Sequence, residues 1–332
     1  MTNIKYLQRF FIALFVGFSM CSIQACSDDD DDDDNGSGGS TGTLSTNVGE
    51  IVQGSGKKLL SVGEYKFYYT SDGKIKYATE WSSYHEFSSN QVISHYGEED
   101  IETISFSFNG NGFISKMQES GSYEDENEKD TYSSTSDLTY DGEGHLTRIT
   151  GKNFEEYTYD GETERTEGTL TINLTWDNGL LTKYEYAGSD DDGWTYRESA
   201  TFDYGDRVYE NRHKQYATFV DYLLGDAASI CAYIGLFGAG PDYLPVKMNL
   251  VCVEEWEDEE YTDNYNYNYS YTYEFNEDGT IRRANSDDFT YGTIEEQGEF
   301  SPNENEYQAK ATRAGQIQRR HALFENRLKS RN

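Results

Sequence analysis

The sequence predicts an all-β protein, an antiparallel meander of repeated hairpins that forms a barrel-like or strongly curved sheet. Three observations predict it: aromatic residues recur at every second position in one stretch, a hairpin motif recurs six times, and prolines are scarce. The chain holds only 3 prolines among 332 residues, and its 29 tyrosines and 17 phenylalanines favour strands. Apolar residues often alternate with Thr, Ser, Glu or Lys, which indicates one buried and one solvated face.

The clearest strand lies between Tyr265 and Phe275. Because strand side chains alternate between faces, a period of two places all the rings on one face and Asn, Ser, Thr and Glu on the other. The stretch ends in Asn276-Glu277-Asp278-Gly279, a turn composition, and a short alternating strand follows. The pattern predicts a β-hairpin whose rings belong to Tyr265, Tyr267, Tyr269, Tyr271, Tyr273 and Phe275.

The same order of residues occurs five more times: an aromatic residue, a short turn rich in Asp, Asn and Gly, and then an aliphatic residue. The two ends of the motif are six residues apart in five copies and five apart in the sixth. An even offset places both ends on one face of the sheet. The pairs are Tyr69 and Ile75, Phe108 and Ile114, Tyr140 and Leu146, Trp176 and Leu181, Phe202 and Val208, and Phe275 and Ile281.

Residues 1–25 predict a lipoprotein signal peptide. The apolar run from Phe10 to Met20 follows two cations and is shorter than the roughly 20 residues of a transmembrane helix. It leads to Ile23-Gln24-Ala25-Cys26, which resembles a bacterial lipobox with Cys26 as the lipid acceptor. The alternative is an ordinary signal peptide that is cleaved after Ala25 and carries no lipid.

Residues 26–47 predict an acidic, flexible tether. The run of aspartates from Asp28 to Asp34 repels itself and cannot fold, and Asn35–Thr43 is a Gly/Ser/Thr linker. Cys26 followed by Ser-Asp-Asp-Asp resembles the signal that sends Bacteroides-type lipoproteins to the outer face of the outer membrane. The resemblance implies a protein anchored to outer-membrane lipid by an N-terminal acyl chain and exposed on the cell surface. The alternative is a solvated spacer.

Residues 48–307 predict a single β domain, which is within the size of one barrel or sandwich. One segment, about residues 216–237, has helical spacing of its apolar residues, with Phe219 and Tyr222 in one group and Ile230 and Tyr233 in another. Gly225 between the groups favours two short helices over one. We expect this insertion either to cover an opening in the sheet or to complete the core.

Residues 308–332 predict a basic C-terminal tail or short helix. From Ala309 onward the tail holds seven cations and a single acid, Glu325. The first interpretation is a solvated or packed terminal helix. The second is a tail that docks on the acidic body of the protein or on acidic lipid. The cations are Lys310, Arg313, Arg319, Arg320, Arg327, Lys329 and Arg331.

The formal charge of the chain is −34, and loss of Lys5 and Arg9 with the signal peptide makes it −36. We therefore expect no binding to nucleic acid, because phosphate affinity depends on a basic surface. Of four cysteines, two belong to the leader, and Cys231 and Cys252 remain. The export compartment permits a disulfide between them, and the alternative is a pair of buried thiols.

The residues predict no catalytic centre, no metal site and no cofactor. No two of the five histidines have metal-ligand spacing on one element, and no phosphate loop, dinucleotide motif or nucleophile elbow occurs. Flat aromatic side chains offer instead a platform for sugar rings or a protein partner. The alternative is that the rings face the core. The candidate platform consists of Tyr265, Tyr267, Tyr269, Tyr271, Tyr273, Trp194 and Trp256.

Taken together, the leader, the hairpin motifs and the segment from Gly238 to Pro245 resemble a family of gut-bacterial surface lipoproteins of unknown function with a porin-like fold. The resemblance implies no known reaction and no catalytic residue. The leading hypothesis is a non-enzymatic surface protein that binds a glycan or a protein. The alternatives are an integral outer-membrane barrel that passes solutes and a glycoside hydrolase built on carboxylates.

Overall fold

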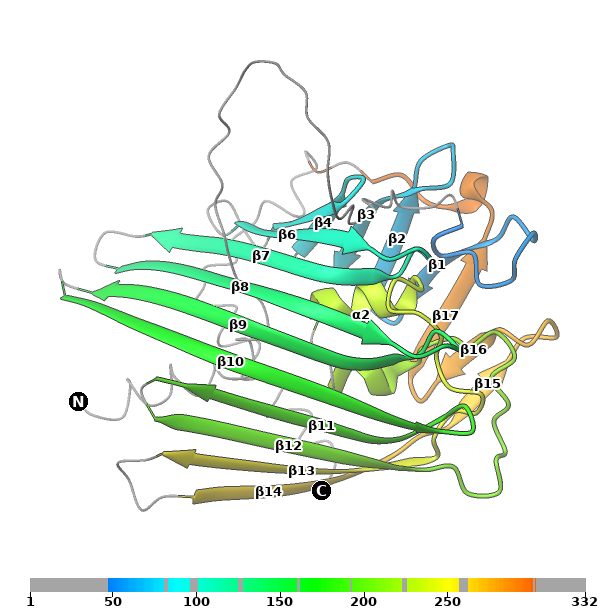
Figure 1. Ribbon diagram of the computed structural model, residues 1–332. Coiled ribbons are helices and arrows are strands. Elements are labelled where there is room, and N and C mark those ends of the chain that lie inside the picture. The colour runs from blue at the N-terminus through cyan, green and yellow to red at the C-terminus, as the bar shows by residue number, and fades with distance from the viewer. Residues whose placement is uncertain are drawn as a thin grey trace, which may run out of the picture.

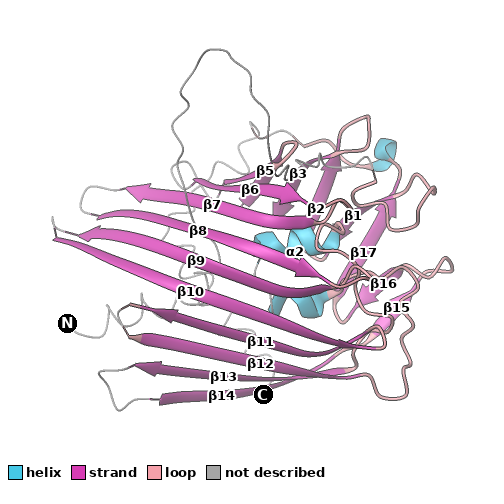
Figure 2. Cartoon of the chain, viewed as in Figure 1, coloured by secondary structure: helices cyan, strands magenta, loops and turns pink. Residues whose placement is uncertain are grey.

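The structure is a computed structural model that describes residues 47–80, 83–95, 101–124, 128–159, 162–191, 193–222, 226–256, 262–300 and 302. The predictions for the signal peptide, for Cys26, for nearly all of the tether and for the basic tail lie outside these residues. The described residues form one antiparallel sheet of seventeen strands, and two short helices lie inside its curve (Figures 1 and 2). The sheet is not closed. The predicted all-β meander is confirmed.

Most of the sheet is a simple meander in which each strand pairs with the next along the chain, from β2 to β14. Its early strands are short and its middle strands are long, up to 16 residues in β10. The strands are β2 (Tyr65–Tyr69), β3 (Ile75–Glu80), β4 (Ser83–Phe87), β5 (Gln91–His95), β6 (Ile101–Phe108), β7 (Ile114–Glu124), β8 (Glu128–Tyr140), β9 (Leu146–Tyr159), β10 (Glu162–Asp177), β11 (Leu180–Asp190), β12 (Trp194–Asp203), β13 (Lys247–Trp256) and β14 (Thr262–Ser270).

A second, smaller meander continues the sheet from its other edge. It consists of β15 (Tyr273–Phe275), β16 (Ile281–Ala284) and β17 (Asp287–Gly292), and it reaches β2 through β1 (Lys58–Val62). The ladder is interrupted between β14 and β15, although only Tyr271 and Thr272 separate them in the chain. The Tyr271 amide donates to Val246 on one side, and the Thr272 carbonyl accepts from Asn285 on the other, both at 2.9 Å. The segment therefore changes partners at this point.

Five of the six predicted hairpins are confirmed, and they share one geometry. In each, the aromatic residue pairs directly with the aliphatic residue across a register shift, as in Tyr140 with Leu146. Four of the turns carry glycine at φ between 82° and 89°, in the left-handed region that favours this residue. We call this end of the sheet the hairpin end. These glycines are Gly73, Gly112, Gly144 and Gly279.

The sixth predicted hairpin, from Phe202 to Val208, is wrong. A turn does form there, since the Arg207 amide donates to Tyr204 at 2.8 Å, but no strand follows it. Val208 is 67% exposed, and the chain leaves the sheet until Lys247. The local residues encode the reversal, whereas a returning strand needs an alternating stretch after the turn.

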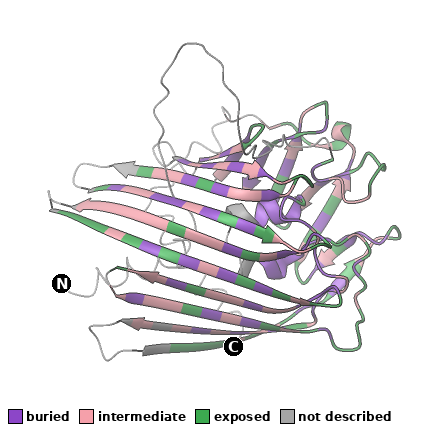
Figure 3. Cartoon of the chain, in the orientation of Figure 1, coloured by how far each residue is buried: buried purple, intermediate pink, exposed green. Residues whose placement is uncertain are grey.

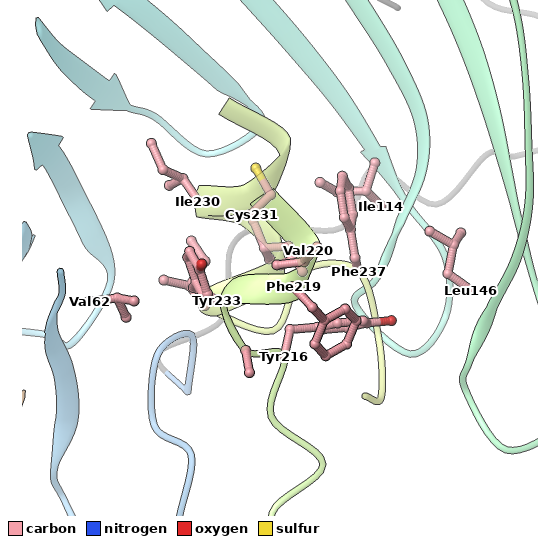
Figure 4. Close-up of a cluster of buried hydrophobic side chains, with 14 of the residues drawn as sticks. Val62, Ile114, Leu146, Tyr216, Phe219, Val220, Ile230, Cys231, Tyr233 and Phe237 are labelled. Carbon is pink, nitrogen blue, oxygen red and sulfur yellow. The ribbon is translucent and has the colours of Figure 1, made fainter. Parts of the chain in front are cut away.

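The excursion that follows β12 fills the hairpin end from inside. It contains the 3-10 helix η1 (Thr218–Tyr222) and the helix α2 (Asp226–Tyr233), which confirms the prediction of two short helices. Figure 4 shows its side chains Phe219, Ile230 and Phe237 packed inside the sheet. We call residues 216–239 the plug. It both covers this end of the sheet and completes the core, so the two expected roles coincide.

Backbone bonds fasten the plug to the hairpin turns. The Ile114 amide donates to Leu236 at 2.9 Å, and the Ala239 amide donates to Gly144 at 2.9 Å. A third bond, from Gly49 to Ile234 at 3.2 Å, connects the plug to the start of the described chain. The plug is therefore held at the hairpin end by contacts far apart in the sequence.

Candidate functional site

The strand register defines two faces of the sheet. The inner face carries the residues that pack around the plug, such as Leu138, which pairs with Ile149, which in turn pairs with Ile172. Buried and exposed residues alternate along the long strands (Figure 3). We call the inner-facing part of β6 to β14 that lies beyond the plug, away from the hairpin end, the rim half.

The predicted tyrosine ladder lies on the inner face. Tyr267 pairs with Leu250 and Tyr269 pairs with Met248, and both partners belong to the core. Tyr273 and Tyr271 are buried at the hairpin end, Tyr269 and Tyr267 are half-buried, and Tyr265 is 36% exposed. Neighbouring ring centroids lie 6.3 to 6.4 Å apart within Tyr265–Tyr269 and between Tyr271 and Tyr273. The ladder therefore begins as core and ends as surface, and it is broken between β14 and β15.

Aromatic rings on the neighbouring strands extend this surface. Trp194 is buried and stacks on Tyr196, with centroids 5.9 Å apart and ring planes 5° from parallel. Tyr196 also meets Tyr186 edge to face at 5.6 Å. The backbone of Trp256 pairs with Trp194 in the ladder between β12 and β13, and its side chain lies outside the described residues. The structure thus places Trp194 beside further rings that the sequence analysis did not select.

One functional candidate that sequence reasoning missed is Glu198, on the inner face of β12. It is 9% exposed, and its Oε2 accepts a hydrogen bond from the Tyr196 hydroxyl at 2.7 Å. The Cys252 thiol, on the strand alongside, lies 3.7 Å from the same oxygen. Burial raises the pKa of Glu198 to about 7, and the bonds from Tyr196 and Cys252 act in the opposite direction. The side chain is therefore poised to exchange a proton near neutral pH.

The signal for Glu198 was present in the alternation of β12. Residues 194, 196, 198 and 200 lie on the same face of β12. Three of them, Trp194, Tyr196 and Ala200, are aromatic or small, as expected for inward positions. A carboxylate at an inward position of a strand is costly to bury unless it is hydrogen-bonded or protonated. Its partner Cys252 is 54 residues away in sequence, so the pairing itself could not be inferred from the sequence.

Acids and cations are divided between the two faces of β6 to β14. Among the described side chains of these strands, seven inward positions are acidic, and no lysine or arginine points inward. The cations lie on the outer face, where Arg165 contacts Glu156 at 2.6 Å and Arg197 contacts Glu255 at 3.2 Å. The inward acids are Glu102, Glu119, Asp130, Glu155, Glu164, Asp190 and Glu198.

The rim half therefore combines carboxylates with tyrosines. In one row across three strands, Asp130 pairs with Tyr157 and Tyr157 with Glu164. In the next row, Tyr132 pairs with Glu155. A surface of this kind accepts hydrogen bonds, offers flat apolar rings and attracts positive charge.

Cys231 in α2 and Cys252 in β13 are both buried and both free. The structure thus corresponds to the second alternative, two buried thiols. Burial raises the pKa of each thiol to about 12, and for Cys252 the nearby Glu198 adds to the effect. Both thiols are therefore protonated, unreactive groups at neutral pH.

Within the described ranges, no group of three or more His, Cys, Asp or Glu side chains is placed to hold a metal ion. No helix in the described part of the chain is long and apolar enough to cross a membrane.

Comparison with known proteins gives structural likeness only. No family model matches the chain, and no curated protein matches it. A porin-like protein from Bacteroides vulgatus is 14% identical, with a TM-score of 0.43, over 68% of this chain and 91% of that one. A porin-like protein from Bacteroides uniformis is 13% identical, with a TM-score of 0.39, over 73% and 92% of the two chains. The lipoprotein family that the sequence resembles stays a prediction.

Proposed function

We propose that the protein is a non-enzymatic binding protein whose ligand, a glycan or a protein, binds to the rim half of the inner face. The observation that carries the proposal is the course of the tyrosine ladder. Its rings leave the core at Tyr271 and continue along the inner face to Tyr265, which is 36% exposed. Tyr269 and Tyr267 still pack against the core, whereas Tyr265 lies beyond it, so a contact with a ligand accounts for the outermost ring better than packing does.

The chemistry of the rim half fits this class of ligand. Tyrosine and tryptophan rings stack on the apolar faces of sugars and on peptide side chains, and inward carboxylates accept hydrogen bonds from hydroxyl and amino groups. Among the side chains that the structure describes, seven inward acids and no inward cation line β6 to β14, which disfavours anionic polymers, including nucleic acid.

The proposal includes the anchor that the leader predicts. Cys26 would carry the acyl chain, and residues 27–47 would hold the domain away from the outer-membrane lipid on the cell surface. Metabolic labelling with a clickable fatty acid tests this part. Labelling that survives the substitution Cys26→Ser would contradict Cys26 as the acceptor.

The solute-passing barrel is the second candidate, and the outer face argues against it. A spanning barrel presents an apolar band to lipid, whereas the outward positions of β10 include Thr169, Thr171, Asn173 and Thr175. The outward positions of β14 include Asn264, Asn266 and Asn268. We therefore expect the mature protein with Cys26→Ser to stay in solution without detergent. Precipitation that only detergent reverses would favour the barrel instead.

The test of binding uses the full mature protein on a glycan array and as bait for proteins of the surrounding medium. The double variant Tyr265→Ala with Tyr267→Ala removes two inward rings, and we expect it to weaken binding by tenfold or more. The matched control, Asn264→Ala with Asn266→Ala, changes outward residues of the same strand. Binding that is absent throughout, or that the two double variants weaken equally, would overturn the proposal.

A further inference from the structure

We propose that the free edge of β14 pairs with the same edge of a second copy of this chain, so that two sheets join into one across a twofold axis. The inference goes beyond the proposed function and does not depend on it. Its reasons are the direction of the backbone groups along β14, the length and regularity of this edge, and the lack of charge on it.

Alternate backbone groups of β14 point away from its neighbour β13. The Tyr271 amide, directly after the strand, donates to Val246 on the β13 side. Because the direction of these groups alternates along an extended strand, the odd-numbered residues of β14 face β13 and the even-numbered residues face away from it. No described residue bonds to the backbone amides or carbonyls of Asn264, Asn266 and Asn268, and all three residues are exposed. Figure 1 shows β14 as the outermost strand on this side of the sheet.

The two end strands of the sheet differ in how they are protected against pairing with another chain. Natural edge strands are commonly short, bulged, charged or interrupted by proline. At one end, β15 has three residues, a register shift after Glu274 and an ion pair between Glu274 and Arg282. At the other end, β14 has nine residues, no proline, no lysine or arginine, and an unbroken register with β13. The fold therefore leaves the edge of β14 open to another strand.

The edge of β14 is complementary to itself. Antiparallel pairing across a twofold axis puts the edge-facing residues of both copies opposite one another, so that Asn lies opposite Asn and Tyr lies opposite Tyr. Either Asn266 or Tyr267 then lies opposite its own counterpart. Aromatic pairs across neighbouring strands stabilise a sheet. On the outer face, the Asn249 side chain donates to Asn266 at 2.8 Å and to Asn268 at 3.0 Å, and a second copy continues this row of amides.

Charge favours a second copy over other occupants of this edge. The chain carries a formal charge of −34, so two copies repel each other over most of their surfaces. The stretch Asn264–Tyr273 contains no charged residue, so pairing along it places no charge against another. A cationic peptide is the alternative occupant, and it finds no acid on this stretch. The neutral edge therefore suits a partner that presents the same neutral strand.

The pairing joins the inner faces of the two copies. A twofold axis perpendicular to the sheet keeps inner face beside inner face, so the rings of Tyr265, Tyr267 and Tyr269 lie next to those of the second copy. Because the paired strands are antiparallel, the two hairpin ends lie at opposite ends of the pair. The described chain starts at the hairpin end, where Gly49 bonds to Ile234. An anchored pair on one membrane would therefore lie along it, whereas a single copy would stand on its hairpin end.

Sedimentation velocity of the full mature protein with Cys26→Ser measures the pairing. We expect a dimer whose dissociation constant falls at least threefold when NaCl is raised from 0.05 M to 0.5 M, because salt screens the repulsion between the acidic copies. An interface built on ion pairs would weaken with salt, and that result would contradict a neutral edge. A monomer at about 0.1 mM protein, as expected if another segment of the chain covers β14, would overturn the inference.

A proline at position 266 separates strand pairing from other contacts. The Asn266 amide faces away from β13, so Asn266→Pro removes an edge donor and no backbone bond to β13. We expect it to raise the dissociation constant of the dimer tenfold or more. Asn266→Thr is the matched control, because it changes the same side chain and keeps the amide, and it should leave the dissociation constant within about twofold. Equal dissociation constants for the two variants would contradict pairing through the backbone.

An exchange of charges keeps the inference testable if the proline variant does not fold. Asn266→Lys with Asn268→Lys puts like charges opposite each other in either register, and Asn266→Glu with Asn268→Glu does the same with the opposite sign. We expect each double variant to be a monomer alone and an equal mixture of the two to form a mixed dimer. Double variants that stay dimeric alone, or that stay monomeric when mixed, would overturn the inference.

Discussion

The hairpin end and the rim half are built from the same strands, yet they are opposite in character. On β8, Leu138 packs around the plug, whereas Asp130 on the same face is a carboxylate in an acidic row. The tyrosine ladder passes from one region to the other, with Tyr273 6% exposed and Tyr265 36% exposed. The alternation along a strand therefore decides which face a residue occupies. Contact with the plug decides whether that face carries apolar core residues.

The largest difference between the two regions should appear in the free energy of unfolding. Phe219 in the plug is 1% exposed and packs against Phe202 at 5.9 Å and Tyr271 at 6.5 Å. We expect Phe219→Ala to cost about 3 to 5 kcal/mol, because it leaves a cavity in the core. Tyr265→Ala at the rim should cost less than about 1 kcal/mol by denaturant titration. Similar losses at the two sites would contradict the division into core and surface.

The next largest effect is the pH dependence of the free energy of unfolding that Glu198 causes. The folded protein keeps this carboxyl protonated up to about pH 7, whereas its ordinary pKa is 4.5. Its contribution to stability is therefore complete below about pH 4.5 and is lost as the pH rises through about 7, by on the order of 3 kcal/mol.

Denaturant titrations between pH 4 and pH 8 measure this effect. Glu198→Gln is neutral at every pH, so the variant should gain stability relative to the unmodified protein as the pH rises. Glu255→Gln is the control, because this acid faces outward on the neighbouring strand beside Arg197. A pH profile that Glu198→Gln leaves unchanged would show that Glu198 titrates normally.

Alanine substitutions at two glycines test the contact between the plug and a hairpin turn. Gly238 and Gly112 have nearly equal φ angles of 84° and 82°, so an alanine at either is strained by roughly 1 to 2 kcal/mol. A Cβ at Gly238 would lie 2.2 Å from the Gly144 carbonyl oxygen, whereas a Cβ at Gly112 meets nothing within 4 Å. Gly238→Ala should cost about 1 to 3 kcal/mol more than Gly112→Ala. Equal melting temperatures would mean that the plug does not press on that turn.

The smallest effect concerns the hydrogen bond beside Glu198. Tyr196→Phe removes the hydroxyl that donates to Glu198, so it should raise the pKa of this carboxyl further and cost about 1 kcal/mol. The midpoint of the pH profile should move upward. Tyr186→Phe keeps the ring cluster and leaves the Tyr196 bond intact, and it should leave the midpoint in place. A midpoint that moves downward in Tyr196→Phe would contradict the bond.

The sequence predicted features that depend on neighbouring residues and missed those that depend on distant ones. Hairpins such as the one from Tyr140 to Leu146 were predictable, because a glycine turn and a fixed offset set the register locally. The false hairpin at Phe202 shows the limit, since a turn does not reveal whether a strand follows. The break at Tyr271 was also invisible, because its cause is a change of partner strands.

The candidate site also has features that neighbouring residues predict and features that depend on contacts between distant residues. Alternation placed the rings from Tyr265 to Tyr273 on one face, but only the plug tells which of them are core. The two helices were predictable from the spacing of Phe219 and Ile230, whereas their position depends on bonds to Ile114 and Gly144. Glu198 could have been noticed as an acid at an inward position, but its contact with Cys252 joins strands that are distant in the sequence.

The bond from Gly49 to the plug decides how an anchor at Cys26 would present the molecule. The chain enters the fold at the hairpin end, where Gly49 bonds to Ile234 and also accepts from Leu59 at 2.8 Å. A Gly-rich random coil of about 20 residues, which is the separation in sequence between Cys26 and Asn47, has a root-mean-square length of roughly 25 Å. A lipid at the far end of that tether would hold the protein by its plugged side. The rim half would then face away from the membrane, into the surroundings of the cell.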